Sequence, residues 1–151
     1  MQYQKTDKKF VAIINRKKPL HEILNALAHT SAGITSVISD PESTCFLNYM
    51  DGDGGSHPAI SHHPFVILQA DNSNQVRKAR NAALELGLKV NSFVGQMFGV
   101  SAEDQLQKTA AAKGEDIDYV LAVLFGDAET MQQVTKKYSL FRASAASPQV
   151  A

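Results

Sequence analysis

The chain contains one cysteine, Cys45, no tryptophan and no excess of charge of either sign, since 15 Lys and Arg residues balance 15 Asp and Glu residues. A lone cysteine excludes a disulfide within the chain. The balanced charge argues against a dedicated nucleic-acid-binding protein, because such proteins normally carry a basic excess. No stretch approaches the roughly 20 apolar residues of a membrane-spanning helix, and the polar N-terminal sequence lacks the apolar centre of a signal peptide. These absences predict a protein of the reducing cytoplasm with no membrane partner.

What is present is the composition of an ordinary globular domain. The 151 residues are 44% hydrophobic and 20% charged, which suits one domain with a buried core. We expect a polar lead-in over residues 1–9, a single α/β domain over residues 10–142 and a flexible, Ala- and Ser-rich tail over residues 143–151. Within the domain, the segment 39–63 is rich in Asp, Gly, Ser, His and Pro and is expected to form a long loop. Loops of this length are usually functional or mobile.

Apolar runs and helical patterns alternate along the domain. Each of four short apolar runs is typical of a buried strand, and each precedes a stretch with helical spacing or a helix-capping residue. The predicted strands are residues 10–14, 64–68, 88–98 and 119–125. This alternation predicts the α/β class, with a three-layer α/β/α sandwich built on a four-stranded sheet.

The segment Phe10–Gly33 best indicates where a ligand binds. Its apolar strand leads into the basic turn Arg16-Lys17-Lys18 and then into a helix opened by Pro19. Open α/β sheets bind ligands at the ends of their strands. The turn is therefore a candidate site for a small anionic, phosphate-containing or nucleotide-like ligand. The crowding of basic residues at this end of the chain also fits a solvated rim with no ligand.

Polar residues of the predicted helix add to this candidate site. His21, Asn25 and His29 recur at intervals of four residues, which places them along one side of the helix beside its apolar stripe. They would form the polar wall of a pocket, with Lys17 and Lys18 supplying positive charge. The alternative is a half-buried helix flank in which Asn25 bonds to the backbone.

The segment 39–63 supplies His57 as a further candidate ligand-binding residue. Two adjacent histidines in this segment cannot easily face one ion. The run Asp-Gly-Asp-Gly-Gly at residues 51–55 lacks the remaining ligands of a calcium loop and is expected to form a glycine turn. We therefore expect no metal and no cofactor, and no catalytic residue is assigned.

Three segments in this order resemble parts of the type II peptidyl-tRNA hydrolases. They are the strand, basic turn and helix ending in His-Thr-Ser-Ala-Gly at 29–33, the helix and turn of 76–88, and the strand 122–126 with the short helix after it. The similarity covers most of residues 9–142.

The chain more closely resembles an uncharacterised bacterial family that shares the peptidyl-tRNA hydrolase II-like fold. This resemblance rests on Leu24-Asn25, on the Pro-containing segment 57–64 and on the pair Met97-Phe98. It implies a mixed four-stranded sheet and a fold of that type, with no assigned activity.

The hydrolase activity does not follow from the resemblance. Type II hydrolases open the first helix with Gly-Lys, whereas this chain has His21-Glu22, so the lysine position carries the opposite charge. Their later Asp-Ala-Gly stretch is Val94-Gly95-Gln96 here, which lacks the carboxylate, although His29 falls on the family's helix histidine. Two alternatives to small-ligand binding therefore stay open. One is residual hydrolysis of peptidyl-tRNA, and the other is a non-catalytic, homodimeric interaction module that uses the long loop and an exposed apolar face.

Overall fold

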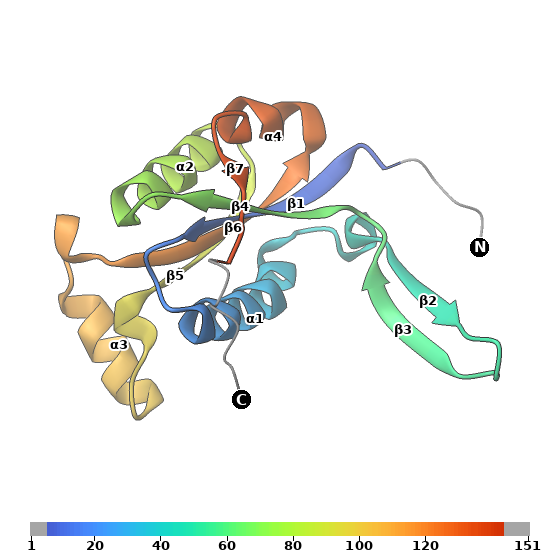
Figure 1. Ribbon diagram of the computed structural model, residues 1–151, viewed down its shortest axis with the longest axis horizontal. Coiled ribbons are helices and arrows are strands. Elements are labelled where there is room, and N and C mark those ends of the chain that lie inside the picture. The colour runs from blue at the N-terminus through green and yellow to red at the C-terminus, as the bar shows by residue number, and fades with distance from the viewer. Residues whose placement is uncertain (1–5, 144–151) are drawn as a thin grey trace, which may run out of the picture.

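The structure is a computed structural model that describes residues 6–143, apart from the side chains of Pro41 and Glu42. Its central sheet has five strands in the order β5-β6-β1-β4-β7 (Figure 1). β1 and β4 run parallel, and the other neighbouring strands are antiparallel. The strands are β1 (Lys8–Asn15), β4 (Phe65–Ala70), β5 (Lys89–Val94), β6 (Tyr119–Asp127) and β7 (Ser139–Leu140).

Helices lie on both faces of this sheet. α1 (Leu20–Val37) packs on one face, whereas α2 (Ser73–Glu85) and α4 (Ala128–Thr135) pack on the other (Figure 1). α3 (Ala102–Ala111) follows β5 through a short 3-10 helix, Gly95–Met97, and buries none of its own residues. The predicted α/β class is confirmed.

The central strands β1 and β6 each contain a continuous apolar run because both of their faces are covered there. In β1, Val11 and Ile13 belong to the core under α2 and α4, whereas Phe10, Ala12 and Ile14 belong to the core under α1. This division follows the two-residue period of a strand. The continuous apolar runs that predicted buried strands therefore arise from helices on both sides of the sheet.

The sheet has five strands, and the expected number of four is wrong. The additional strand is β7, whose Leu140 and Ser139 pair with Leu68 and Gln69 of β4. A strand of two residues is too short to show a period of two, so the sequence carries no pattern for it. The predicted strand 88–98 also ends earlier, at Val94, because the chain turns into the 3-10 helix.

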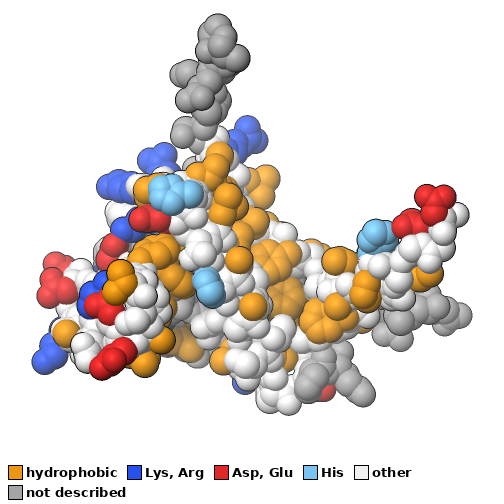
Figure 2. Space-filling view, turned by 90° about the horizontal axis from the view of Figure 1, so that it is seen from below, with side chains coloured by type: hydrophobic (Ala, Val, Ile, Leu, Met, Phe, Trp, Pro, Cys, Tyr) orange, Lys and Arg blue, Asp and Glu red, His pale blue; other side chains and the backbone are white. Residues whose placement is uncertain are grey.

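The long loop expected over residues 39–63 is largely a hairpin. β2 (Phe46–Met50) and β3 (Ser56–Ser61) pair only with each other and project from the rest of the molecule (Figures 1 and 2). The glycine turn predicted at 51–55 is confirmed, since the Asp51 N–H donates to the Gly55 carbonyl at 3.0 Å. The sequence does not identify this hairpin, because most residues of its two strands are exposed. They therefore lack the alternation of a half-buried strand.

Several predicted boundaries also shift. The polar lead-in expected over residues 1–9 is shorter, because β1 begins at Lys8. For α1, whose sequence fits either a helix to about Ile38 or a break near Gly33, the structure shows the longer helix, which ends at Val37. Most of the tail expected over residues 143–151 lies outside the described residues, as do residues 1–5. Among the helices of residues 6–143, none has both the length and the apolar content needed to cross a bilayer.

Candidate functional site

The turn between β1 and α1 is held in place by backbone hydrogen bonds, such as that from the Arg16 N–H to the Ala70 carbonyl at 3.0 Å, and by one buried side chain. Asn15, the last residue of β1, is only 3% exposed. Its Nδ2 donates to the Tyr119 carbonyl at 3.1 Å, and its Oδ1 accepts from the Lys17 N–H at 3.1 Å. These two bonds connect the end of β1 with the start of β6 and with the basic turn. The start of α1 is thereby fixed relative to the sheet.

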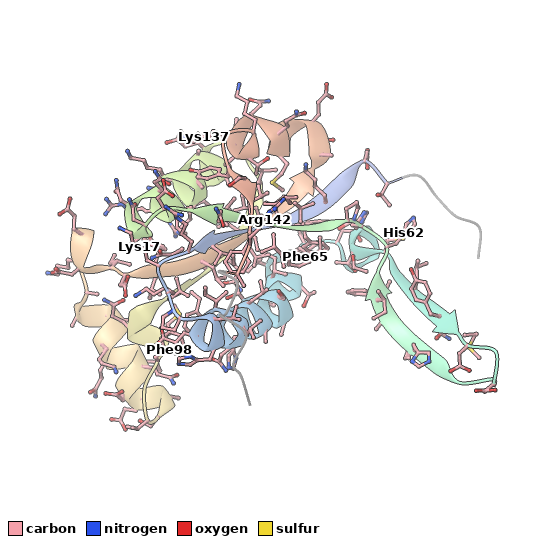
Figure 3. The ribbon with its side chains drawn as sticks, viewed as in Figure 1. Lys17, His62, Phe65, Phe98, Lys137 and Arg142 are labelled. Carbon is pink, nitrogen blue, oxygen red and sulfur yellow. The ribbon has the colours of Figure 1, made fainter. Side chains whose placement is uncertain are left out.

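The basic residues of the turn lie apart from one another. Lys18 is half-buried and forms an ion pair with Asp118, next to the start of β6. Arg16 pairs with Asp71 at 2.8 Å, with both side chains largely exposed. Lys17 is exposed, and Figure 3 places it at the same end of the molecule as Phe98. Two of the three cations of the turn are thus already neutralised.

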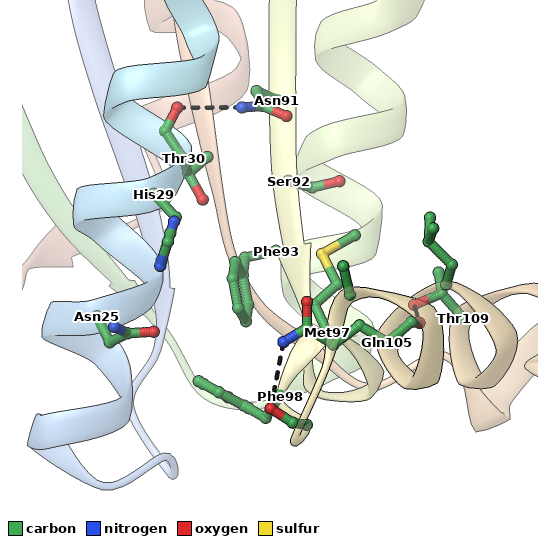
Figure 4. Close-up of a pocket in the computed structure, with 13 residues that line it drawn as sticks. Asn25, His29, Thr30, Asn91, Ser92, Phe93, Met97, Phe98, Gln105 and Thr109 are labelled. Carbon is green, nitrogen blue, oxygen red and sulfur yellow. Dashed lines mark hydrogen bonds between the residues drawn. The ribbon is translucent and has the colours of Figure 1, made fainter.

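A cavity of about 590 Å³ opens between α1, β5, the 3-10 helix and α3 (Figure 4). Two of the residues predicted to form a pocket wall, Asn25 and His29, line it from α1. The lining consists of uncharged polar, apolar and aromatic residues, with histidine as its only titratable type. Its members are Asn25, His29, Thr30, Asn91, Ser92, Phe93, Met97, Phe98, Gly99, Ala102, Gln105, Leu106 and Thr109.

Three rings follow one another along the wall of this cavity. The His29 ring lies 6.3 Å from the Phe93 ring between centroids, with an interplanar angle of 30°. The Phe93 ring lies 4.9 Å from the Phe98 ring at 53°. Both distances lie within the range of favourable ring contacts. The cavity therefore presents aromatic surface from a helix, a strand and the segment before α3.

The polar groups of the cavity divide into those with and those without protein partners. Asn91 Nδ2 donates to the Thr30 carbonyl at 3.0 Å, and Gln105 Nε2 donates to the Gly99 carbonyl at 3.3 Å. These bonds tie α1 to β5 and α3 to the segment before it. Within residues 6–143, the Asn25 side chain forms no protein hydrogen bond. Its amide is therefore available to a ligand as both donor and acceptor.

The other predicted site residues do not reach this cavity. Lys17, Lys18 and His21 belong to the turn and to the first turn of α1, and none of them lines it. His57 lies on the hairpin, at the opposite end of the molecule from α3 (Figure 1). The structure therefore unites Asn25 and His29 and separates them from the other four residues.

His57 instead stabilises the hairpin turn. One of its ring nitrogens lies 2.9 Å from Asp51 Oδ2. This hydrogen bond and those from the Gly55 and Asp53 N–H groups hold the pKa of Asp51 below its ordinary value. Within the described residues, no group of three His, Cys, Asp or Glu side chains is placed to hold a metal ion.

Sequence reasoning missed the residues that β5 and α3 contribute, among them Phe93 and Gln105. The feature that points to these residues is the exposure of α3, whose Leu106 is 72% exposed. A helix that buries none of its residues contributes little to the hydrophobic core and can instead line a cavity. That signal becomes visible only when the burial of each residue is known.

Comparison with solved structures shows a common fold. The structure of a protein of unknown function from Agrobacterium tumefaciens superposes with a TM-score of 0.77 at 21% sequence identity, covering 91% of this chain and 100% of that chain. No curated protein matches the chain. A family model described as "protein of unknown function (DUF2000)" matches residues 8–142. The expectation of a family of unknown function is thus confirmed, and the chain belongs to the DUF2000 family of proteins of unknown function.

Proposed function

We propose that the cavity between α1, β5 and α3 binds a small ligand with a planar, uncharged ring, such as a nucleobase or a similar heterocycle. The observation that carries this proposal is the uncharged lining, in which His29, Phe93 and Phe98 supply ring surface. Aromatic side chains favour stacked and edge-to-face contacts with such rings. A volume of about 590 Å³ lies within the range of small-molecule sites.

The edge of the ring would be recognised by amide and hydroxyl groups. The Asn25 amide can donate and accept at once, which suits the adjacent donors and acceptors of a nucleobase edge. A ligand that also carries an anionic group would direct it toward the turn before α1, where Lys17 is exposed. The helix rises about 8 Å from its first residue, Leu20, to Asn25, which is comparable with the length of a nucleotide.

The test begins with native mass spectrometry of the purified chain, to find any small molecule that remains bound. Binding of nucleosides and of their monophosphates is then measured by calorimetry. His29→Ala and Asn25→Ala are each expected to weaken binding about fivefold, because each removes a ring contact or a hydrogen bond worth roughly 1 kcal/mol.

The matched control for these variants is His21→Ala. His21 lies two turns before His29 on the same helix and is exposed like His29, but it does not line the cavity. His21→Ala is expected to leave the affinity unchanged. The proposal is wrong if this variant weakens binding as much as His29→Ala does, or if no heterocycle binds at all.

A second function is favoured by the position of His29 in the cavity wall. We propose residual hydrolysis of peptidyl-tRNA as the alternative, together with a three-layer, peptidyl-tRNA hydrolase II-like fold, supported by the parallel β1–β4 pair and by helices on both faces of the sheet. A reducing cytoplasm as the site of action is supported by the single cysteine.

The hydrolysis of peptidyl-tRNA is tested with the purified chain. Release of the peptidyl group by the wild-type chain, and its loss in His29→Ala, would support this activity. No release at all would eliminate it.

A further inference from the structure

The β2–β3 hairpin exposes several large apolar side chains to water, which is energetically unfavourable. The exposed fractions are 51% for Tyr49, 61% for Met50 and 52% for Ile60. Neither strand pairs with the central sheet. A two-stranded hairpin is marginally stable alone, and clustered exposed apolar residues mark interaction surfaces. The hairpin therefore has the character of an arm that packs against another surface.

A second exposed apolar surface lies on α1. Leu20 and Leu24 follow each other at helical spacing and are 46% and 57% exposed. Figure 2 shows hydrophobic side chains gathered over the middle of this face and continuing toward the root of the hairpin. The exposed Lys17 stands just before Leu20 in the chain. On this surface an apolar stripe is thus followed by a positive charge.

We propose that the hairpin of one copy packs on α1 of a second copy, so that the chain forms a two-fold symmetric dimer with exchanged arms. On each of the two surfaces, exposed apolar residues are followed by a charged turn, and the two turns carry opposite charges. Along the hairpin, Ile60 and Tyr49 precede the acidic turn that contains Asp53. Along α1, in the direction of its N-terminus, Leu24 and Leu20 precede the basic turn.

The charges that would meet are those left unpaired within one chain. Asp51 is occupied by His57 and by its own turn, whereas Asp53 forms no ion pair within residues 6–143. In the basic turn, Arg16 is paired with Asp71, whereas Lys17 likewise has no acidic partner in this range. A contact between Asp53 and the partner's Lys17 would neutralise both. The formal net charge of zero adds no repulsion between copies.

A second copy is the favoured occupant because one chain carries both surfaces. In a two-fold dimer, each hairpin-to-α1 contact is made twice, so the buried interface area is twice that of a single contact. The partner's arm would lie along α1, the helix that also supplies Asn25 and His29 to the cavity. The dimer does not depend on the identity of the ligand.

The test measures the mass of the full chain by sedimentation equilibrium at micromolar concentration. The expected mass is twice the 16.4 kDa of one chain. Ile60→Asp is expected to give the mass of one chain, because it places a charge in the apolar contact. The matched control is Leu84→Asp on α2, an exposed leucine outside both surfaces and outside the cavity, which should leave the dimer intact. A monomeric wild-type chain, or a dimer unaffected by Ile60→Asp, overturns the proposal.

A charge exchange tests the docking of the arm on α1 with two exposed side chains that form no ion pair within residues 6–143. Asp53→Lys and Lys17→Asp are each expected to weaken the dimer about tenfold at low salt, because like charges then face each other in both contacts. The double variant is expected to recover the wild-type dissociation constant. If it remains as weak as either single variant, the arm docks elsewhere and the assignment to α1 is wrong.

Discussion

Removal of the Asn15 side chain tests whether this residue holds the turn before α1 in place. Asn15→Ala deletes the donor to the Tyr119 carbonyl and the acceptor for the Lys17 N–H, each at 3.1 Å. The Tyr119 carbonyl acceptor belongs to a buried hydrogen bond, so its loss leaves an unsatisfied buried group. The Lys17 N–H lies in an exposed turn and can bond to water instead.

The expected loss in the free energy of unfolding is the sum of these two effects. An unsatisfied buried carbonyl costs about 1–3 kcal/mol, and a lost bond at a solvent-accessible N–H costs about 1 kcal/mol. Asn15→Ala should therefore destabilise the chain by about 2–4 kcal/mol. With a urea m-value of about 2 kcal/mol/M, the midpoint should fall by about 1–2 M. The melting temperature should fall by roughly 10 °C.

Urea unfolding followed by far-UV circular dichroism measures this loss, with Asn81→Ala as the control. Asn81 is an exposed residue of α2 that accepts from Arg80, and its removal should change stability by less than about 0.5 kcal/mol. Asn15→Asp should be at least as harmful as Asn15→Ala, because a carboxylate oxygen would face the Tyr119 carbonyl oxygen. If Asn15→Ala unfolds at the same midpoint as Asn81→Ala, the turn does not depend on this side chain and the reasoning fails.

Two further predictions concern the cavity and the hairpin. A Cβ on Gly33 would lie 2.8 Å from Asn91 Nδ2, so Gly33→Ala should displace the Asn91 amide from the Thr30 carbonyl. The gain of about 1 kcal/mol expected for Ala in a helix should then be absent in urea unfolding, and a gain of that size would contradict the contact. At the hairpin, the pKa of Asp51 is lowered in the folded chain chiefly by His57. The stabilisation is therefore present above the ordinary value of 3.8 and is lost as pH falls through the lowered pKa. Relative to the intrinsic exchange rate at each pH, the protection of the amides in the hairpin turn should fall in that acidic range, and His57→Ala should make this change smaller. A turn that exchanges equally in both proteins would refute the coupling.

The sequence predicted those parts of the fold that repeat a period over many residues. The run from Phe10 to Ile14 and the run from Tyr119 to Phe125 became the central strands β1 and β6. The helical spacing of Leu20, Ile23 and Leu27 predicts a helix where the structure has α1. A strand covered on both faces, or a helix covered on one, requires a long apolar pattern, and such a pattern can be recognised without coordinates.

The hairpin and β7 could not be predicted in the same way. The residues of β2 and β3 face mostly water, so burial imposes no alternation on them. β7 consists of Ser139 and Leu140 alone, and it exists because the end of the chain returns to the edge of β4. Both elements depend on pairing between segments, and pairing is not encoded in a local pattern.

The cavity was predicted in part, for a definite physical reason. Asn25 and His29 lie on one side of one helix, so helical spacing was enough to group them. Phe93, Phe98 and Gln105 come from other elements, and only the position of α3 beside β5 brings them to the same cavity. His57 was grouped with the residues of α1 as a candidate, but the spacing of residues in the sequence does not give the distance in space between the hairpin and α1.

The sequence by itself determined the alternation of strands and helices, the buried strands and the polar side of α1, because each depends on a short-range periodicity. The tertiary structure alone decided which strands are neighbours, which cations of the basic turn are paired, and that the cavity is uncharged. It also decided that the segment 39–63 projects as a hairpin. These properties arise from contacts between residues far apart in the chain, such as Lys18 with Asp118 and Asn15 with Tyr119. Such contacts form only when the sheet order is set.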